Sequence, residues 1–180
     1  MPGSPGPAVL FPQRVIIGVG ELAVSNNPNV TLSTYALGSC VGLVAYDPVR
    51  RGGGILHIML PQSALSPEKA GQQPAMFADT GVPALFDSLR GIGAERRRLR
   101  LYLAGGACVL SGPDTFKIGE RNISATRQML SVYGCPATDI ELGGTINRTL
   151  HLEIATGRLT IKRPDRTQEI DLGPLSSSAM

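Results

Sequence analysis

The sequence has few of the residues that define several common classes of protein. Its 180 residues include no tryptophan, three cysteines and two histidines. The cysteines are odd in number and lack the spacing of a disulfide framework, which argues for a reducing, cytoplasmic setting. The cysteines and histidines form no CxxC or HxxxH pair, and this argues against a zinc site.

Long hydrophobic runs and a strong charge bias are also missing. No window approaches a membrane span, and no apolar leader opens the chain. The formal net charge of +3 comes from 14 arginines and three lysines against 14 acidic residues, so charge gives no argument for a nucleic-acid partner. No repeat of roughly 20 to 50 residues is visible, which argues against a solenoid. The Gly18-x-Gly20 pair is too short for a dinucleotide-binding loop.

The sequence does contain enough hydrophobic residues for one sizeable core. They make up 42% of the chain, and a length of 180 residues favours one domain. We expect this domain to span residues 13–173. The flanking segments 1–12 and 174–180 are expected to be disordered tails, because their Pro, Gly and Ser content cannot offset the entropy of ordering.

Runs of β-branched and alternating apolar residues, bounded by turn residues, predict many strands. The expected strands are 14–20, 30–37, 37–47, 53–61, 99–104, 139–142, 149–154, 158–162 and 167–172. Helical spacing of apolar residues predicts helices over 75–89 and from 118 to 133. This order predicts an α+β fold: a single domain with mainly antiparallel or mixed β-sheet layers and two packed helices.

The two apolar runs on either side of residues 48–52 predict a β-hairpin. The first run contains Cys40 and the second contains His57. If the turn centres between Pro48 and Val49, Cys40 lies directly opposite His57. Residues paired in this way have Cβ atoms about 4.5 to 5.5 Å apart, so a thiol and an imidazole can share a proton. The sequence therefore predicts a Cys/His dyad.

Such a dyad is suited to acyl transfer, because the thiolate is a nucleophile and the histidinium can protonate a leaving group. Gly38 and Ser39 leave the backbone free to turn, so amide N–H groups around Cys40 can face a developing oxyanion. The hydroxyl of Thr34 can orient His57 by accepting a hydrogen bond from its other ring nitrogen. The remaining cysteines and histidine are interpreted as structural; they are Cys108, Cys135 and His151.

Each of these residues also has a non-catalytic interpretation. A cysteine in an apolar strand is more often a small buried hydrophobe, and Thr34 has the β-propensity of its type. Residues 38–42 also fit the G-x-C-x-G form of a nucleophile elbow, but that motif needs a helix directly after the nucleophile, where residues 41–46 predict a strand. The arginines of 96–100 are interpreted as a solvated end before a strand, with an acidic partner surface as the alternative.

A series of short motifs runs in order from about Val15 to Ile170. They are Leu-Gly-Ser-Cys-Val at 37–41, Tyr-Asp-Pro at 46–48, Gly-Gly-x-x-His-x-Met-Leu-Pro at 53–61, Phe-Ala-Asp-Thr at 77–80, Ala-Gly-Gly-Ala at 104–107, Ile-Gly-Glu-Arg-Asn at 118–122, Gly-Gly-Thr at 143–145 and Ala-Thr-Gly-Arg at 155–158. Together they resemble the CheD family of chemoreceptor glutamine deamidases. The chain departs from the family pattern at Cys108, where Asn or Ser is usual, and at residues 145–147 before Arg148.

The resemblance implies hydrolysis of selected glutamine side chains on the cytoplasmic helical bundle of chemoreceptors, giving glutamate and ammonia without a cofactor, nucleic acid or membrane insertion. The catalytic residues of the family fall on Cys40, His57 and Thr34. The loop 62–73 and four residues near the dyad are candidates for contacting the substrate; the four are Gly38, Ser39, Gly105 and Gly106. Some members bind a CheC-type phosphatase, which is implied as a second partner. The alternative is a non-catalytic chemotaxis adaptor that binds such a phosphatase or a receptor.

Overall fold

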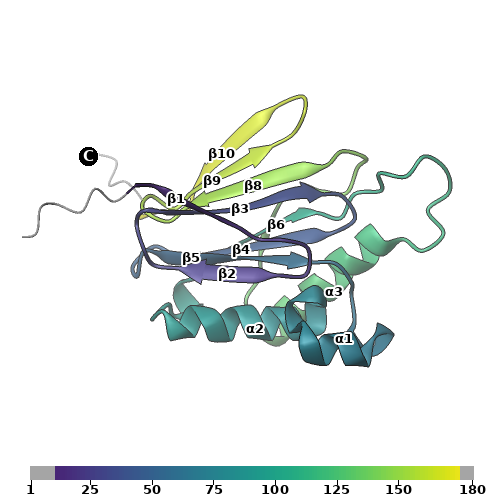
Figure 1. Cartoon of the computed structure of the whole chain (residues 1–180), viewed down its shortest axis with the longest axis horizontal. Helices are drawn as coiled ribbons and strands as arrows, with labels where there is room; N and C mark the ends of the chain where they lie inside the picture. The colour runs from purple at the N-terminus through teal and green to yellow at the C-terminus, as the bar shows by residue number, and fades with distance from the viewer. Residues whose placement is uncertain (1–10, 175–180) are drawn as a thin grey trace, which may run out of the picture.

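In residues 11–174, which are those that the computed structural model describes, ten strands form two five-stranded sheets (Figure 1). The first sheet has the order β1-β3-β8-β9-β10, with β1 (Gln13–Ile16), β3 (Val30–Leu37), β8 (Arg148–Glu153), β9 (Arg158–Lys162) and β10 (Thr167–Asp171). The second has the order β2-β5-β4-β6-β7, with β2 (Leu22–Ser25), β5 (Gly52–Ile58), β4 (Val41–Asp47), β6 (Arg100–Gly105) and β7 (Thr138–Leu142). The predicted segments 1–10 and 175–180 of the tails lie outside the described residues.

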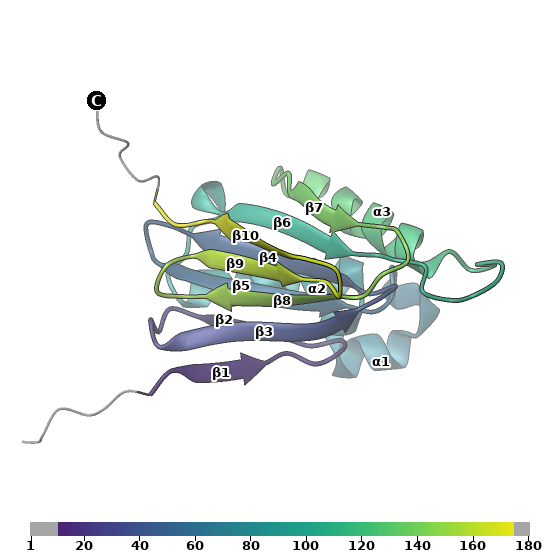
Figure 2. The same ribbon diagram turned by 90° about the horizontal axis from the view of Figure 1, so that it is seen from above.

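Both sheets are mixed, since one pair of strands in each is parallel. These pairs are β1 with β3 and β6 with β7, and the remaining pairs are antiparallel. The two sheets lie face to face, as the view from above shows (Figure 2). The predicted α+β fold with mixed sheet layers is therefore confirmed, while the expected domain boundaries remain a prediction.

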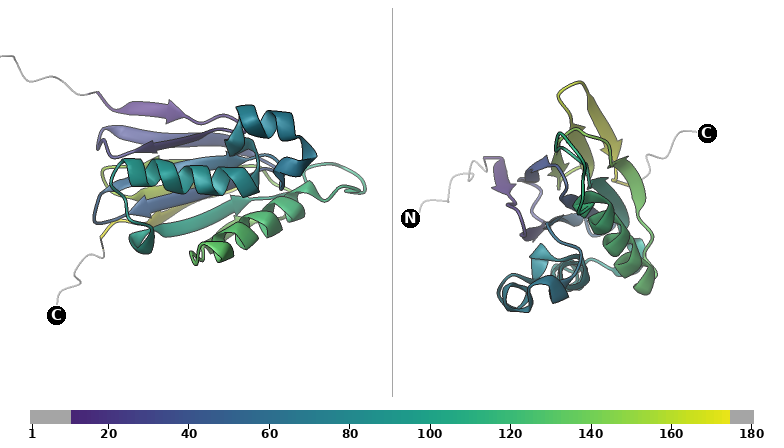
Figure 3. Two further views of the ribbon diagram at one scale, coloured as in Figure 1. Left: turned by 90° about the horizontal axis from the view of Figure 1, so that it is seen from below. Right: turned by 90° about the vertical axis from the view of Figure 1, so that its right-hand side faces the viewer.

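Two long helices cover the outer face of the second sheet (Figure 3). They are α2 (Ala78–Gly91) and α3 (Ile118–Val132), which confirms the two predicted helices. A shorter helix, α1 (Pro67–Gln72), and the 3-10 turn η1 (Ser63–Leu65) occupy the segment predicted as a loop, and a second 3-10 turn, η2 (Pro74–Met76), stands where the first predicted helix was expected to begin. Proline at the first position of α1 is a helix-start signal that explains this difference. Of the helices between residues 11 and 174, none has the length and hydropathy to cross a bilayer.

The central strands β4 and β5 are buried on both faces, and alternation along them separates two cores. Val41, Leu43 and Ala45 face the helices and pack with the buried side of α2. Val44 and Tyr46 face the first sheet and pack with its strands. Even-numbered residues of β4 therefore face the space between the two sheets. Cys40, which directly precedes β4, follows the same alternation.

The hairpin formed by β4 and β5 does not have the predicted register. Asp47 pairs with Gly52, so the turn centres one residue later than expected. This shift moves the pairing by two residues and places His57 opposite Gly42. The prediction that Cys40 lies directly opposite His57 is therefore wrong.

The side chain of Asp47 explains the position of this turn. Its carboxylate accepts hydrogen bonds from the N–H groups of Val49, at 3.0 Å, and Arg50, at 3.1 Å. Its carbonyl accepts a bond of 2.8 Å from the N–H of Arg51, which has a φ of 53°. An aspartate that binds the backbone ahead of it starts a turn at its own position, and here that effect exceeds the preference of Pro48 for the turn centre.

Candidate active site

Cys40 and His57 lie on the same face of the second sheet although they are not directly paired. His57 is opposite Gly42, and a Cβ built on Gly42 would approach Leu150 of β8, so this face points to the first sheet. Cys40 lies two residues before Gly42 and packs against the core between the sheets. The two residues are thus diagonal neighbours, for which separations of about 7 to 8 Å between backbones are typical and within reach of an aromatic side chain. The corrected register keeps the thiol and the imidazole in one space.

Thr34 of β3 determines the protonation of the His57 ring. Its hydroxyl oxygen is 2.7 Å from Nδ1 of His57 and donates a bond of 2.8 Å to the carbonyl of Ile17. A threonine hydroxyl has one proton, and a carbonyl can only accept. We therefore assign the proton between Thr34 and His57 to Nδ1, which leaves Nε2 as the unprotonated nitrogen. The hydrogen bond that the sequence predicts between these two residues is present.

The unprotonated nitrogen of His57 is buried in the protein. The residue is 1% exposed, and Nε2 is buried without a hydrogen-bond partner among residues 11–174. Burial lowers the pKa of His57 from its ordinary value of 6.5 to about 4, and the Glu21 carboxylate opposes this only in part. The imidazole is therefore neutral at neutral pH, with a lone pair available to accept a proton.

The thiol of Cys40 is half-buried, and burial raises its pKa. At neutral pH the resting pair is therefore a thiol and a neutral imidazole rather than an ion pair. Within the described part of the chain, the N–H groups of Ser39 and Cys40 donate to no backbone or side-chain acceptor. These two amides are therefore available to bind an oxyanion beside the sulfur.

Gly105 and Gly106 support the loop that carries Cys40. Both glycines have positive φ, of 101° and 67°, and both are buried. The N–H of Gly106 donates to the Cys40 carbonyl at 2.8 Å, and a Cβ on Gly105 would collide with the same carbonyl. Gly38 is held similarly, since its carbonyl accepts a bond of 2.7 Å from the N–H of Ala107. The role of these glycines in substrate binding remains a prediction, as does that of half-buried Ser39.

Asn122 is a residue of this site that the sequence analysis did not single out. Its side-chain Nδ2 donates to the carbonyls of Ser39 and Met59, both at 2.9 Å. It belongs to the buried stripe of α3, where Gly119, Asn122, Thr126 and Leu130 face the sheet. A polar residue in step with a buried helical stripe is the signal that could have identified it.

The residues interpreted as structural belong to other elements than those that carry the predicted dyad. His151 is on the other face of the first sheet from Thr34, since its Nδ1 lies 2.7 Å from the hydroxyl of the adjacent Ser33. Cys108 is half-buried in the loop after β6, and Cys135 is buried after α3. Residues 11–174 contain no group of three His, Cys, Asp or Glu side chains placed to hold a metal ion.

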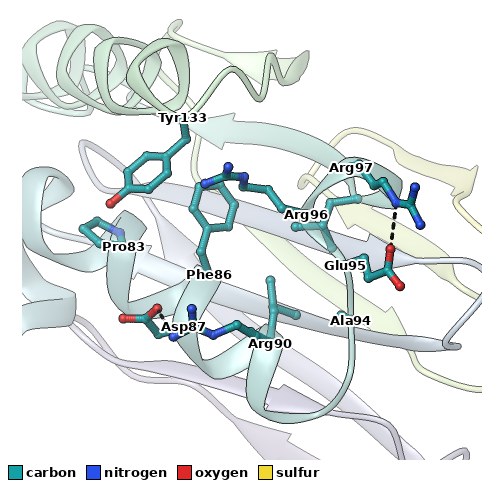
Figure 4. Close-up of a pocket in the computed structure, with 11 residues that line it drawn as sticks. Pro83, Phe86, Asp87, Arg90, Ala94, Glu95, Arg96, Arg97 and Tyr133 are labelled. Carbon is teal, nitrogen blue, oxygen red and sulfur yellow. Dashed lines mark hydrogen bonds and ion pairs between the residues drawn. The ribbon is translucent and has the colours of Figure 1, made fainter.

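A groove of about 550 Å³ between α2, α3 and the turn at η3 (Arg96–Arg98) contains none of the predicted site residues (Figure 4). The rings of Phe86 and Tyr133 meet edge to face with centroids 5.1 Å apart, and Arg96 lies 5.5 Å from the centroid of Tyr133. The arginine cluster of the sequence is therefore divided. Arg96 and Arg97 are exposed, while Arg98 binds the buried carboxylate of Asp47.

Known proteins match this chain over most of its length. The family model described as "CheD chemotactic sensory transduction" matches residues 59–163. A crystal structure of the hypothetical protein YfiH of Bacillus licheniformis is similar with a TM-score of 0.45 and 15% identity, over 75% of this chain and 61% of that one.

Three relatives are similar in sequence, each named a "Probable chemoreceptor glutamine deamidase CheD", in one case with the number 1. The protein of Solibacter usitatus is 43% identical over 88% of this chain and 94% of its own. The protein of Syntrophus aciditrophicus is 42% identical over 82% and 92%, and that of Syntrophotalea carbinolica is 40% identical over 86% and 96%. On these matches, the chain belongs to the CheD family.

Proposed function

We propose that this chain is a chemoreceptor glutamine deamidase, a protein-glutamine glutaminase of the Cys/His type. Relatives with 40% to 43% identity are named probable chemoreceptor glutamine deamidases, and this name supports the first part of the proposal. The observation that carries the proposal is the hydrogen bond of 2.7 Å between Thr34 and His57, because it leaves Nε2 of His57 free in the space that Cys40 faces. The substrate is a glutamine side chain on the cytoplasmic helical bundle of a receptor, and a CheC-type phosphatase is the further partner.

The first step of the proposed reaction is attack of the Cys40 sulfur on the glutamine carboxamide carbon. Because the resting pair is neutral, the thiol proton moves to Nε2 of His57 as the carbon–sulfur bond forms. The carboxamide oxygen becomes an oxyanion, and the free N–H groups of Ser39 and Cys40 can bind it. Loss of one such donor typically raises the barrier by about 2.7 to 4 kcal/mol.

The second step releases ammonia and then glutamate. The carbon–nitrogen bond breaks as the His57 imidazolium gives its proton to the departing nitrogen, which leaves a thioester on Cys40. Water then attacks the thioester carbon and passes a proton to Nε2 of His57. This proton returns to the sulfur as the carbon–sulfur bond breaks. The sum is glutamine and water giving glutamate and ammonia.

The test is incubation with the cytoplasmic fragment of a chemoreceptor, read as ammonia release and as the mass gain of roughly one dalton that conversion of an amide to an acid gives. Cys40→Ala should abolish both signals, and Cys108→Ala is the matched control because that cysteine has no assigned role. Equal traces from the wild type and Cys40→Ala would refute the enzyme and leave the adaptor function.

The same assay tests the hydrogen bond between Thr34 and His57 through variants of Thr34. Thr34→Val removes the acceptor for Nδ1–H of His57, so we expect kcat to fall by about 10²-fold, the lower end of the range known for acid–base groups. Thr34→Ser keeps a hydroxyl at the same place and should retain most of the activity. Equal kcat values for the Val and Ser variants would contradict the assigned tautomer.

A further inference from the structure

Asn122 joins two segments of chain at the point where the hairpin ladder ends. The last pair of the ladder between β4 and β5 is Val41 with Ile58. Just beyond it, the side-chain Nδ2 of Asn122 donates to the carbonyls of Ser39 and Met59, both at 2.9 Å. The side-chain amide of Asn122 therefore links the two strands where their ladder hydrogen bonds end. Its partners are Ser39, next to Cys40, and Met59, two residues after His57.

The packing of α3 against the Cys40 loop fixes the orientation of this amide. Gly119, one turn before Asn122, lies so close to the backbone of Gly106 that a Cβ would collide with the Gly106 carbonyl. Asn122 is 0% exposed, so its side chain has no alternative solvent partner. Both neighbours of Nδ2 are carbonyl oxygens, which only accept, so the amide must present its NH₂ group to them.

The bond to the Ser39 carbonyl also controls the direction of the Cys40 N–H. The two groups belong to one planar peptide unit, and in residues 11–174 no peptide bond is cis. In a trans peptide the C=O and N–H groups point in opposite directions. Drawing the Ser39 carbonyl towards α3 therefore directs the Cys40 N–H away from α3, and this N–H has no acceptor within the described residues.

The other atom of the amide supports a role beyond packing. Oδ1 of Asn122 is buried and has no hydrogen-bond partner in the described part of the chain. An unpaired buried acceptor is destabilising, and an apolar side chain of similar size would avoid that cost. The protein thus tolerates the cost of the unpaired Oδ1 at a position where the two N–H groups of Asn122 both have partners.

We propose that Asn122 is a positioning residue for the deamidation: it directs the Cys40 N–H at the developing oxyanion and holds the Cys40 loop beside His57. This inference rests on the proposed function. Because the oxyanion forms only after attack, the effect belongs to the transition state rather than to substrate binding.

The matched variants are Asn122→Ala and Thr126→Val. Thr126 is buried one turn further along the same helix, and among residues 11–174 its hydroxyl bonds only to the Asn122 carbonyl, at 2.7 Å. On the receptor fragment, Asn122→Ala should lower kcat by about 10²-fold, as loss of an oxyanion donor does, with KM within about 2-fold of the wild type. Thr126→Val should retain the wild-type kcat. Equal losses from both variants would reduce Asn122 to a structural residue and overturn the proposal.

Asn122→Asp supplies a readout that a structural role would not give. An ionised carboxylate cannot donate to the two carbonyls, whereas its protonated form can donate once. We expect kcat of this variant to fall as the pH rises through the titration of the new carboxyl group, relative to the wild type. A pH profile parallel to the wild type would overturn the proposal.

Alkylation of Cys40 by iodoacetamide, followed on the Cys40 peptide by mass spectrometry, separates this proposal from the proposed function. The alkylation rate depends on the environment of the thiol and needs no receptor. Asn122→Ala should change the alkylation rate several-fold relative to the wild type, whereas Thr126→Val should leave it unchanged. Equal alkylation rates in the two variants would refute the positioning role. Wild-type protein that releases no ammonia would refute the deamidase function, whatever the alkylation rates are.

Discussion

At the scale of single residues, the proposed chemistry depends on where two hydrogen atoms lie. The Thr34 hydroxyl donates its hydrogen bond to the Ile17 carbonyl. It can therefore only accept from His57, which places the ring proton of His57 on Nδ1. In the proposed reaction the proton acceptor for Cys40 is then Nε2, which has no hydrogen-bond partner among residues 11–174. Burial of this nitrogen makes the imidazole a weak base in the resting protein and a ready acid once it has accepted the thiol proton.

The pH dependence of the reaction should report this burial. The pKa of His57 is lowered to about 4, and the proposed attack needs the unprotonated ring. We expect kcat/KM to fall as the pH decreases through about 4, instead of through the ordinary value of 6.5. Glu21→Gln should move this limb to lower pH, because the Glu21 carboxylate is the group that raises the pKa of His57. An acid limb centred at the ordinary value would contradict the buried, neutral imidazole.

At the scale of elements, Asp47 connects the end of β4 to the arginine run before β6. Its side chain is 0% exposed and accepts bonds from the N–H of Glu95 at 2.9 Å and from the guanidinium of Arg98 at 2.7 Å. Burial alone would raise the pKa of Asp47, but the bonds from Arg98 and from three backbone N–H groups outweigh it and lower the pKa below 3.8. One carboxylate thus holds the hairpin turn against η3.

Asp47→Asn should destabilise the protein by about 3 kcal/mol at about pH 7, because it removes the buried carboxylate from the pair and leaves Arg98 with only the exposed Glu95 as a counter-charge. The lowered pKa of Asp47 stabilises the folded state at pH values above the ordinary pKa of 3.8. This stabilisation is lost as the pH falls through the folded-state pKa. The difference between variant and wild type in urea unfolding should therefore shrink in acid. Asp87→Asn is the control, since the ion pair of Asp87 with Arg90 is 70% and 80% exposed and should contribute about 0 to 1 kcal/mol.

The elements themselves could largely be predicted from the sequence, whereas their pairing could not. The strand over 30–37 and the strand over 158–162 have the predicted bounds, because alternation along them is clear. The four residues of β2 (Leu22–Ser25) were not predicted, since a run this short carries little periodic signal. The stripe predicted for α3 was built from apolar residues, so Asn122 and Thr126, which are polar and buried, could not be found by hydrophobic spacing.

At the scale of the whole molecule, an ionic cluster with a buried centre connects the two sheets. Glu141 of β7 lies 3.0 Å from Arg163 and 3.8 Å from Arg148, and it also binds Arg166. Arg148 lies in β8, and the other two arginines lie between β9 and β10. Burial would raise the pKa of Glu141, but the bonds from Arg163 and Arg166 outweigh it and lower the pKa. No sequence pattern indicates this cluster, because its members are separated along the chain.

Glu141→Gln should destabilise the protein by roughly 3 to 5 kcal/mol, since it leaves Arg148, which is 3% exposed, without a counter-charge. Urea unfolding at about pH 7 measures the effect, and Glu169→Gln on the exposed strand β10 is the matched control, with an expected change below about 0.5 kcal/mol. Adding Arg148→Met to Glu141→Gln should recover part of the loss, because the unpaired buried charge is then gone. No recovery in the double variant would show that the arginine is not the cause.

The contacts that support the Cys40 loop are made mainly by main-chain atoms. The chain segments approach one another closely at Gly105, Gly106 and Gly119. The relatives compared above differ from this chain at more than half of the matched positions. Contacts made by carbonyl and amide groups are indifferent to most of those replacements. Most side-chain replacements elsewhere should therefore leave the Cys40 sulfur in place, provided that these three positions remain glycine.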